Sequence, residues 1–448
     1  MASVIKRGDK YAVVVNYTDE KGDRRQKWTT FKTKKEAKEY AARMDYAAGA
    51  GIPMLFSGAK TVDELWDEYV KNYGLEKWSF SHFDSARRMY DNYVAKYIGR
   101  MKLRDITPRI IETYYHELLQ REAMSSTKKH KAMITPNTVK NIHKLMHSVF
   151  RQAERWELVS SNPFDKAMPP RVKEKKREIW ELDDLKKALD ACADPILELC
   201  INLAFSCSLR MGEIVGLTWD CVHIDDDLIE NNSAWILINK QLQRVSRESV
   251  DSILTEDVIM RFPSQNTKQS TVLILKNPKT ASSIRKLYLP RTVAEMLKKR
   301  KATVEELKNY LGDDYQDYGM VICYENGTPM EGDKIRAAFE KLIKDNGLKR
   351  VVFHSLRHSS TTYKLKLSGG DIKAVQGDTG HAQASMITER YAHILDDDRR
   401  INAEKFEEMF YQNGEDSALS RDTEQLMRIA KKLQDSPELL ALLKGLTD

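Results

Sequence analysis

The sequence predicts a multidomain protein that is mainly α-helical with small β-sheets, and three observations support this class. The chain has 448 residues, which is more than a single domain usually holds. It is 41% hydrophobic and 31% charged, a balance typical of folded domains. Short β-rich runs occur near the N-terminus, whereas helical periodicity dominates much of the remaining chain. We expect an N-terminal three-stranded sheet plus helix, then a helical domain, then a mixed α+β domain.

The first segment, residues 1–55, is predicted to form a small sheet that packs against one helix. Two β-rich runs, 11–17 and 26–31, are separated by a polar turn at 19–23, which favours a hairpin or a three-stranded sheet. Residues 34–46 follow with apolar side chains at helical spacing. These side chains are Ala37, Tyr40, Ala41 and Met44.

Basic residues are in excess in this first segment. The first fifty residues hold 12 bases against 7 acids, within a net charge of +7 for the whole chain. This excess favours a polyanionic partner, although a solvated sheet face would have the same composition. The bases around the predicted strands are Lys6, Arg7, Lys10, Arg24, Arg25 and Lys27.

Residues 61–160 are predicted to form an all-helical domain. Thr61 and Glu64 have the spacing of a capping box, and Thr107-Pro108 and Thr135-Pro136 each place proline at the first position of a helix. The last helix carries an apolar stripe made of Ile142, Leu145, Met146, Val149, Phe150 and Ala153. Its other face and the loop before it are basic. Such a face is either solvated or a site for a polyanion, and its lysines are Lys128, Lys129, Lys131, Lys140 and Lys144.

The rest of the chain divides into a linker, a large domain and a tail. Residues 161–178 combine prolines with a basic run and offer little that could pack, so we expect a linker. Residues 179–400 mix helical and strand patterns. Residues 401–448 are predicted to form a helical tail. Its last helix would carry leucines at 439, 443 and 446, a stripe that needs a partner surface in its own domain or in another copy.

Several classes of protein are disfavoured by what the sequence lacks. No apolar run approaches the ~18 residues that span a bilayer. No GxxxxGK[ST] or GxGxxG motif offers a phosphate cradle. The cysteines have no CxxC spacing and lie among apolar neighbours, which disfavours a disulfide framework or a zinc site and favours a reducing cytoplasm. They are Cys192, Cys200, Cys207, Cys221 and Cys323.

Four clusters in residues 179–400 carry chemistry-bearing side chains in a distinctive order. The first is 208–213, Ser-Leu-Arg-Met-Gly-Glu, in which Arg210 and Glu213 could pair on a helix. The second, 278–290, is predicted to be a β-hairpin whose turn presents Lys279. The third is 354–358, His-Ser-Leu-Arg-His. The fourth is Gly380-His381, followed ten residues later by a tyrosine. Each of these clusters alone is more often structural than catalytic. Their occurrence together in this order favours a catalytic site.

This order resembles that of the tyrosine recombinase (phage-type integrase) family. The family has an SLRxGE-like box, a hairpin lysine, an HxLRH box, a Gly-His box and a nucleophilic tyrosine. The resemblance implies a catalytic domain of the DNA breaking-rejoining type, a SAM-like core-binding domain before it, and an AP2-like arm-binding module at the N-terminus. Two departures are visible, since Thr379 precedes the Gly-His box and the stretch 244–270 is longer than we expect.

Carried over by position, the resemblance implies a site of six catalytic residues. Two fixed guanidiniums would bind the phosphate, a histidine would accept the tyrosine proton, a lysine would protonate the leaving 5′-oxygen, and a second histidine would bind a nonbridging oxygen. The 3′-phosphotyrosine conserves the energy of the broken bond, so neither ATP nor a metal is needed. In that order of roles the residues are Arg210, Arg357, His354, Lys279 and His381, with Tyr391 as nucleophile.

The resemblance also implies partners, and it leaves alternatives open. We expect integration and excision of a phage or conjugative element by a homotetramer on core-type and arm-type DNA sites, in the cytoplasm of a bacterial host at the nucleoid. An excision factor and a DNA-bending protein are compatible accessory partners. No cofactor and no membrane is expected. A chromosome-dimer or plasmid resolvase, a type IB topoisomerase and a DNA-binding regulator without catalysis remain as alternatives.

Overall fold

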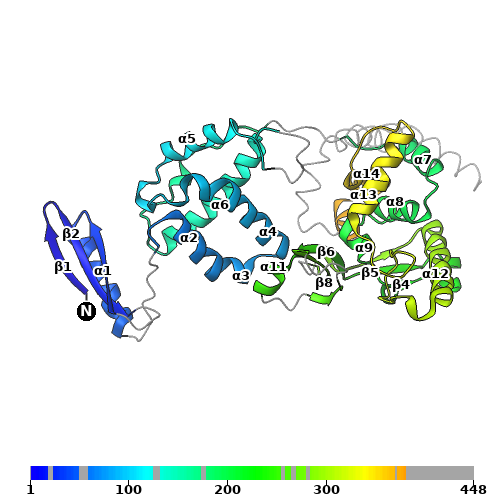
Figure 1. Cartoon of the computed structure of the whole chain (residues 1–448), viewed down its shortest axis with the longest axis horizontal. Coiled ribbons are helices and arrows are strands. Elements are labelled where there is room, and N and C mark those ends of the chain that lie inside the picture. Colours follow the sequence, from blue (N-terminus) through cyan, green and yellow to red (C-terminus); the bar gives the residue numbers. More distant parts are fainter. Residues whose placement is uncertain are drawn as a thin grey trace, which may run out of the picture. The chain divides into compact units, whose positions relative to one another are not determined.

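The computed structural model describes residues 2–18, 24–49, 59–124, 132–172, 178–253, 258–263, 269–278, 283–368 and 371–379. The chain divides into two compact units (Figure 1). Unit 1 comprises Met1–Lys175, Val245–Glu256 and Lys268–Thr271, and unit 2 comprises Lys176–Arg244, Asp257–Thr267 and Val272–Asp448. None of the described helices is both long and apolar enough to cross a membrane. The predicted tail, 401–448, lies outside the described residues.

The N-terminal part of unit 1 is the predicted three-stranded antiparallel sheet with one helix. Strands β1 (Ala2–Arg7), β2 (Lys10–Thr18) and β3 (Arg24–Phe31) pair in the order β1-β2-β3, and α1 (Lys34–Gly49) packs on one face. The predicted turn at 19–23 is outside the described residues. This sheet and helix share a small core of their own, made of Val13, Val15, Ala37, Tyr40 and Ala41.

The second part of unit 1 is helical, as predicted. Thr61 forms the expected capping box with Glu64, and Pro108 and Pro136 occupy the first turns of their helices. All six apolar residues of the predicted stripe on the last long helix are buried. The elements are α2 (Val62–Tyr69), the π-helix η1 (Val70–Gly74), α3 (Leu75–Lys77), α4 (Phe80–Met89), the π-helix η2 (Tyr90–Gly99), η3 (Leu103–Asp105), α5 (Pro108–Leu119), α6 (Pro136–Arg155) and η4 (Pro163–Asp165).

The start of the predicted linker packs, which corrects the sequence interpretation. Asn162 accepts the backbone N–H of Phe164 at 3.0 Å and caps η4. Phe164 is 1% exposed and, with Ala167, belongs to the core of the helical part. An Asn-Pro pair therefore forms a capped turn that carries an anchor here, and the expectation of a linker with little to pack is wrong for residues 162–167.

A segment from the middle of the chain also belongs to unit 1. Helix α11 (Arg247–Ser252) packs on α4. Ser246 donates its backbone N–H and its hydroxyl to the two carboxylate oxygens of Asp84, at 3.0 and 2.5 Å. Arg87 and Glu248 form an ion pair beside this contact. The long stretch noted in the sequence therefore contains a helix with a partner in the helical part.

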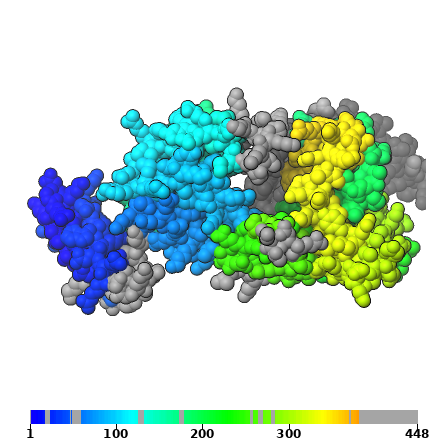
Figure 2. Space-filling model, in the orientation of Figure 1, coloured from blue at the N-terminus to red at the C-terminus, as the bar shows by residue number. Residues whose placement is uncertain are grey.

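Unit 2 holds a large mixed core around α8 and α14, which pack on each other. Figure 2 shows part of its surface, formed by α12 in yellow-green and by the yellow segment with α13 and α14. The helices and helical turns of this part are α7 (Leu182–Asp190), α8 (Pro195–Ser206), α9 (Met211–Val215), η5 (Trp219–Cys221), α10 (Asp226–Glu230), α12 (Arg291–Leu311), η7 (Gly312–Asp314), α13 (Gly332–Asp345), α14 (Phe353–Leu367) and α15 (Ile372–Thr379). The five cysteines are free thiols.

The remaining strands form two three-stranded sheets rather than the predicted hairpin around Lys279. One sheet has the order β4-β5-β9 and the other β6-β8-β7, so the strands on either side of 277–284, β8 and β9, lie in different sheets. The longer stretch before Lys279 supplies the second sheet, which separates β8 from β9. The strands are β4 (Val222–His223), β5 (Trp235–Ile238), β6 (Gln241–Ser246), β7 (Val258–Arg261), β8 (Thr271–Lys276) and β9 (Arg285–Tyr288).

Candidate active site

Arg210 stands at the start of α9, as the N-cap residue of that helix. Its backbone N–H donates to Glu213 Oε2 at 2.9 Å, and its Nη1 donates to Glu213 Oε1 at 2.7 Å. The sequence predicted this pairing. The Arg210 side chain is 37% exposed, so its guanidinium is fixed on one side by Glu213 and remains accessible to solvent.

Glu213 is held by a second arginine from the sheet β4-β5-β9. Arg285 Nη2 lies 2.9 Å from Glu213 Oε2, and both side chains are only 6% exposed. Burial opposes ionisation of this carboxyl, but the hydrogen bond and charge of Arg285, together with the charge of Arg210, outweigh it and lower the pKa of Glu213 to about 2. Glu213 is therefore an anion at neutral pH and forms ion pairs with the guanidiniums of Arg210 and Arg285.

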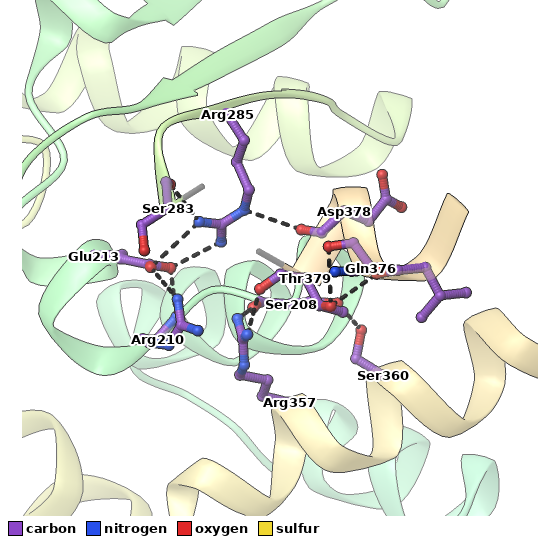
Figure 3. A network of polar contacts seen from close by, with 11 residues as sticks. Ser208, Arg210, Glu213, Ser283, Arg285, Arg357, Ser360, Gln376, Asp378 and Thr379 are labelled. Atoms are coloured by element: carbon purple, nitrogen blue, oxygen red, sulfur yellow. Dashed lines mark hydrogen bonds and ion pairs between the residues drawn. The ribbon is translucent and has the colours of Figure 1, made fainter. Parts of the chain in front are cut away.

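Two arginines bind consecutive carbonyls at the C-terminal end of α15 (Figure 3). Arg285 Nε donates to the carbonyl of Asp378 at 3.0 Å, and Arg357 Nη2 donates to the carbonyl of Thr379. A backbone carbonyl carries partial negative charge, and a guanidinium donates charge-assisted hydrogen bonds to it. The end of α15 is thereby fixed to β9 and to α14.

Arg357 also binds the loop that leads to Arg210. Its Nη1 donates to the carbonyl of Ser208, which lies 149 positions earlier in the chain. Ser208 adopts a left-handed backbone with φ 55°, and its hydroxyl lies 2.5 Å from that of Ser360 on α14. This unusual backbone and two contacts from α14 hold the loop that ends at Arg210.

His354 and Arg357 both lie on α14, three positions apart, but they differ in burial. Arg357 is 2% exposed, whereas His354 is exposed, and its ring meets that of His358 edge-on at 4.8 Å. His354 borders a cavity of about 180 Å³. Residues on both sides of Arg210 also line this cavity, whose lining is Leu209, Met211, Arg336, Val352, Phe353 and His354.

Three of the six predicted catalytic residues, Lys279, His381 and Tyr391, lie outside the described residues. The description stops at Pro278 before the lysine and resumes at Ser283. It also ends at Thr379, two positions before His381. Among the described residues, Arg357 contacts the carbonyl of Ser208, two positions before Arg210.

The sequence interpretation assigned no role to Arg285. It lies two residues before Leu287 on β9, and both side chains are buried while Lys286 between them is exposed. An arginine at the buried position of an alternating strand is a signal that sequence reasoning could have used, because a buried guanidinium requires partners.

The predicted basic residues of the N-terminal sheet divide between its two faces. The strand register places Arg7 and Arg24 on the face opposite α1, and Lys6, Arg25 and Lys27 on the face that α1 covers. Arg7 lies over the ring of Trp28, which is 48% exposed on that open face. Lys27 is half-buried, and burial lowers its pKa.

Of the basic residues predicted in the helical part, Lys140 and Lys144 are exposed on α6, on a face other than its buried stripe. Lys128, Lys129 and Lys131 lie outside the described residues. Accessible guanidinium and ammonium groups of this kind bind phosphates, and Arg210 offers the fork geometry that suits a bidentate contact.

Three family models match consecutive parts of the chain. An arm DNA-binding domain matches residues 3–45, a phage integrase N-terminal SAM-like domain matches residues 61–119, and the phage integrase family matches residues 254–398. The third match spans β7 to β9 and the helices that follow, including α14 and α15.

Curated relatives and solved structures agree with these matches. A tyrosine recombinase XerC-like protein of Caldanaerobacter subterraneus is 25% identical over 429 residues, covering 91% of this chain and 98% of the relative. The ICEBs1 integrase of Bacillus subtilis is 20% identical, covering 73% and 78%. A fragment of the Tn1549 transposon integrase has a similar fold, with a TM-score of 0.58 at 18% identity, covering 78% of this chain and all of that one. With the three models matched in order along one chain, the protein belongs to the phage integrase family of tyrosine recombinases, which break and rejoin DNA.

Proposed function

We propose that the protein integrates and excises a mobile genetic element by cutting and rejoining DNA through a 3′-phosphotyrosine intermediate. The observation that carries this proposal is the contact of Arg357 with the carbonyl of Ser208, two residues before Arg210. This contact places Arg357, from the HxLRH box, against the loop that ends at Arg210, from the SLRxGE-like box. A scissile phosphodiester gains negative charge on its equatorial oxygens during attack, and paired guanidiniums stabilise that charge.

Each catalytic residue then has a separate task in the proposed reaction. Tyr391 attacks phosphorus, and His354 accepts its proton. Lys279 protonates the leaving 5′-oxygen, and His381 donates to a nonbridging oxygen. Rejoining reverses these steps with another 5′-hydroxyl, so the bond energy is conserved in the covalent intermediate and neither a nucleotide nor a metal is required.

The names of the relatives favour a mobile element over the alternative functions. One relative is named an integrase, and Tn1549 is named a transposon, whose integrase fragment was solved with a circular intermediate DNA. The arm DNA-binding match at residues 3–45 favours an integrase over a resolvase, because resolvases of this chemistry are two-domain chains without such a sheet. A type IB topoisomerase would relax plasmid lacking any specific site, and we expect no such relaxation.

The proposed division of labour follows the order of the segments. Residues 1–55 bind arm-type sites, residues 61–160 and the catalytic domain 179–400 hold the core site, and the tail 401–448 contacts another protomer in a tetramer. The exposed lysines of α6, Lys140 and Lys144, contact the core DNA. An excision factor and a DNA-bending protein act with the tetramer at the nucleoid.

A trapping experiment tests the proposed reaction. A duplex from the end of the element, nicked close to the cleavage point, loses a short fragment after attack and so prevents rejoining. The wild-type chain should give a protein–DNA band on a denaturing gel, with or without EDTA. Tyr391→Phe should bind this DNA and give no band.

The matched control is Tyr310→Phe, since Tyr310 is 87% exposed on α12 and has no role in the site. This variant should form the band as the wild type does. An equal band from Tyr391→Phe would refute the assignment of the nucleophile. Loss of wild-type cleavage in EDTA with binding intact would contradict the metal-free reaction.

A further inference from the structure

The contacts of the site form a closed circuit that we call the polar ring. It runs from Arg210 to Glu213, from Glu213 to Arg285, and from Arg285 to the carbonyl of Asp378. The neighbouring carbonyl of Thr379 binds Arg357, which binds Ser208 two residues from Arg210. Figure 3 shows these contacts together. A closed circuit fixes each member from two sides, unlike a set of separate pairs.

Arg285 is the member that joins the most elements. Besides Glu213 on α9 and Asp378 on α15, it donates Nη1 to the carbonyl of Ser283 at 3.0 Å, in the loop before β9. Its side chain is 6% exposed. Each of its three guanidinium nitrogens donates to a protein acceptor, so its effect on the reaction passes through the groups that it holds.

We propose that Arg285 is a positioning residue that sets the spacing between the guanidiniums of Arg210 and Arg357. Arg285 aligns Glu213, which orients Arg210, and it holds the end of α15, to which Arg357 is bound. This inference rests on the proposed function, because it assigns the two spaced guanidiniums to one phosphate.

A lysine cannot replace Arg285 in this task. A guanidinium spreads five donors over a rigid plane, whereas an ammonium concentrates three on one atom. Arg285→Lys therefore keeps the positive charge beside Glu213, which protects the fold, but cannot reach Glu213 and the carbonyl of Asp378 together. The ring opens while the buried charge remains paired.

The test compares cleavage of a nicked core-site duplex at saturating protein by the wild type and Arg285→Lys. The variant should bind the duplex as the wild type does, while its single-turnover cleavage rate falls on the order of 100-fold, as expected for misplaced catalytic groups. The matched control is Arg300→Lys, because Arg300 also donates to two carbonyls, those of Val321 and Cys323, away from the ring. This control should cleave at the wild-type rate.

A second substrate separates positioning from a general loss of structure. A methylphosphonate at the cleavage point carries no charge, so it depends less on the two guanidiniums. The deficit of Arg285→Lys should shrink to within about tenfold on this substrate, since there is less developing charge to stabilise. An equal deficit on both substrates, or wild-type cleavage of the diester by Arg285→Lys, would overturn the proposal.

If Arg285→Lys does not fold, the double variant Glu213→Gln with Arg285→Met serves instead. Replacing both members of a buried ion pair by neutral residues of similar volume often preserves stability. The folded double variant should bind the duplex and lose cleavage; full cleavage would overturn the proposal. If the wild type itself forms no adduct, the proposed function fails. The positioning role fails when the wild type cleaves and either the variants cleave equally or their deficit is the same on both substrates.

Discussion

Glu213 and Arg285 form an ion pair of 2.9 Å in which each side chain is 6% exposed, although 72 positions separate them in the chain. A buried pair of this kind costs desolvation, and it persists where its geometry and additional hydrogen bonds compensate. Arg210 supplies one such bond to Glu213, and the carbonyl of Asp378 accepts another from Arg285. The pair is therefore the link between α9, β9 and α15.

The first prediction concerns the pH dependence of stability. The folded state holds the pKa of Glu213 at about 2, below its ordinary value of 4.5. The stabilisation is therefore complete above pH 4.5 and is lost as pH falls from 4.5 towards 2. Glu213→Gln leaves the charge of Arg285 buried without its anion, which costs about 3–5 kcal/mol at pH 7.

Urea unfolding of both proteins between pH 7 and pH 3 measures this difference. The gap in unfolding free energy between wild type and Glu213→Gln should narrow below pH 4.5. If the difference in unfolding free energy stays constant over this range, the stabilisation by Glu213 does not depend on its charge.

The second prediction concerns the packing of Gly216, at the end of α9, against β6. A Cβ on Gly216 would lie 2.5 Å from the backbone N of Leu242 and 2.7 Å from the Cα of Gln241. Backbone atoms cannot yield as a flexible side chain would, so Gly216→Ala should destabilise the protein by about 1–3 kcal/mol. Thermal unfolding measures the change.

The control is another glycine of unit 2. A Cβ on Gly377, within α15, meets nothing within 4 Å. Gly377→Ala should therefore be neutral or stabilise the protein by up to about 1 kcal/mol, since alanine favours a helix. Equal effects of the two substitutions would disprove the close approach of α9 and β6.

The third prediction concerns the open face of the N-terminal sheet. Arg7→Ala and Arg24→Ala should each weaken binding of arm-type DNA and reduce the salt slope by about 1, as expected for a lost phosphate contact. Cleavage of a core-site duplex should be unchanged. Lys38→Ala on the exposed side of α1 is the control.

Fluorescence titration at several salt concentrations gives both the affinity and the slope. The DNA for this titration is a segment from the element's end that the full chain binds and a chain without residues 1–55 does not. A stronger loss from Lys6→Ala and Arg25→Ala would place the DNA on the other face of the sheet.

Local signals in the sequence predicted much of unit 1. The capping box of Thr61 and the prolines 108 and 136 mark helix starts through contacts within one turn, so their outcome did not depend on distant residues. Phe164 differs, because its burial depends on α6, and composition alone suggested a linker there.

The sequence predicted the motifs of the site but not the contacts between its elements. Arg210 pairs with Glu213 three positions away, a spacing that sequence reveals. The partners of Arg285 lie on α9 and α15, far from it in the chain. The placement of β8 and β9 in different sheets likewise depends on strands that are distant in sequence. Non-local pairing of this kind leaves only an indirect trace, such as an arginine at a buried strand position.

The most direct test of the account identifies the residue that bears the DNA. The trapped complex is digested with nuclease and trypsin, and the peptide of residues 391–399, Tyr-Ala-His-Ile-Leu-Asp-Asp-Asp-Arg, is sequenced by mass spectrometry. The account predicts a 3′-phosphonucleotide on Tyr391, within this peptide or within one extended through Arg390. A nucleotide on another residue, or a trapped strand with no protein attached, would contradict the proposed reaction.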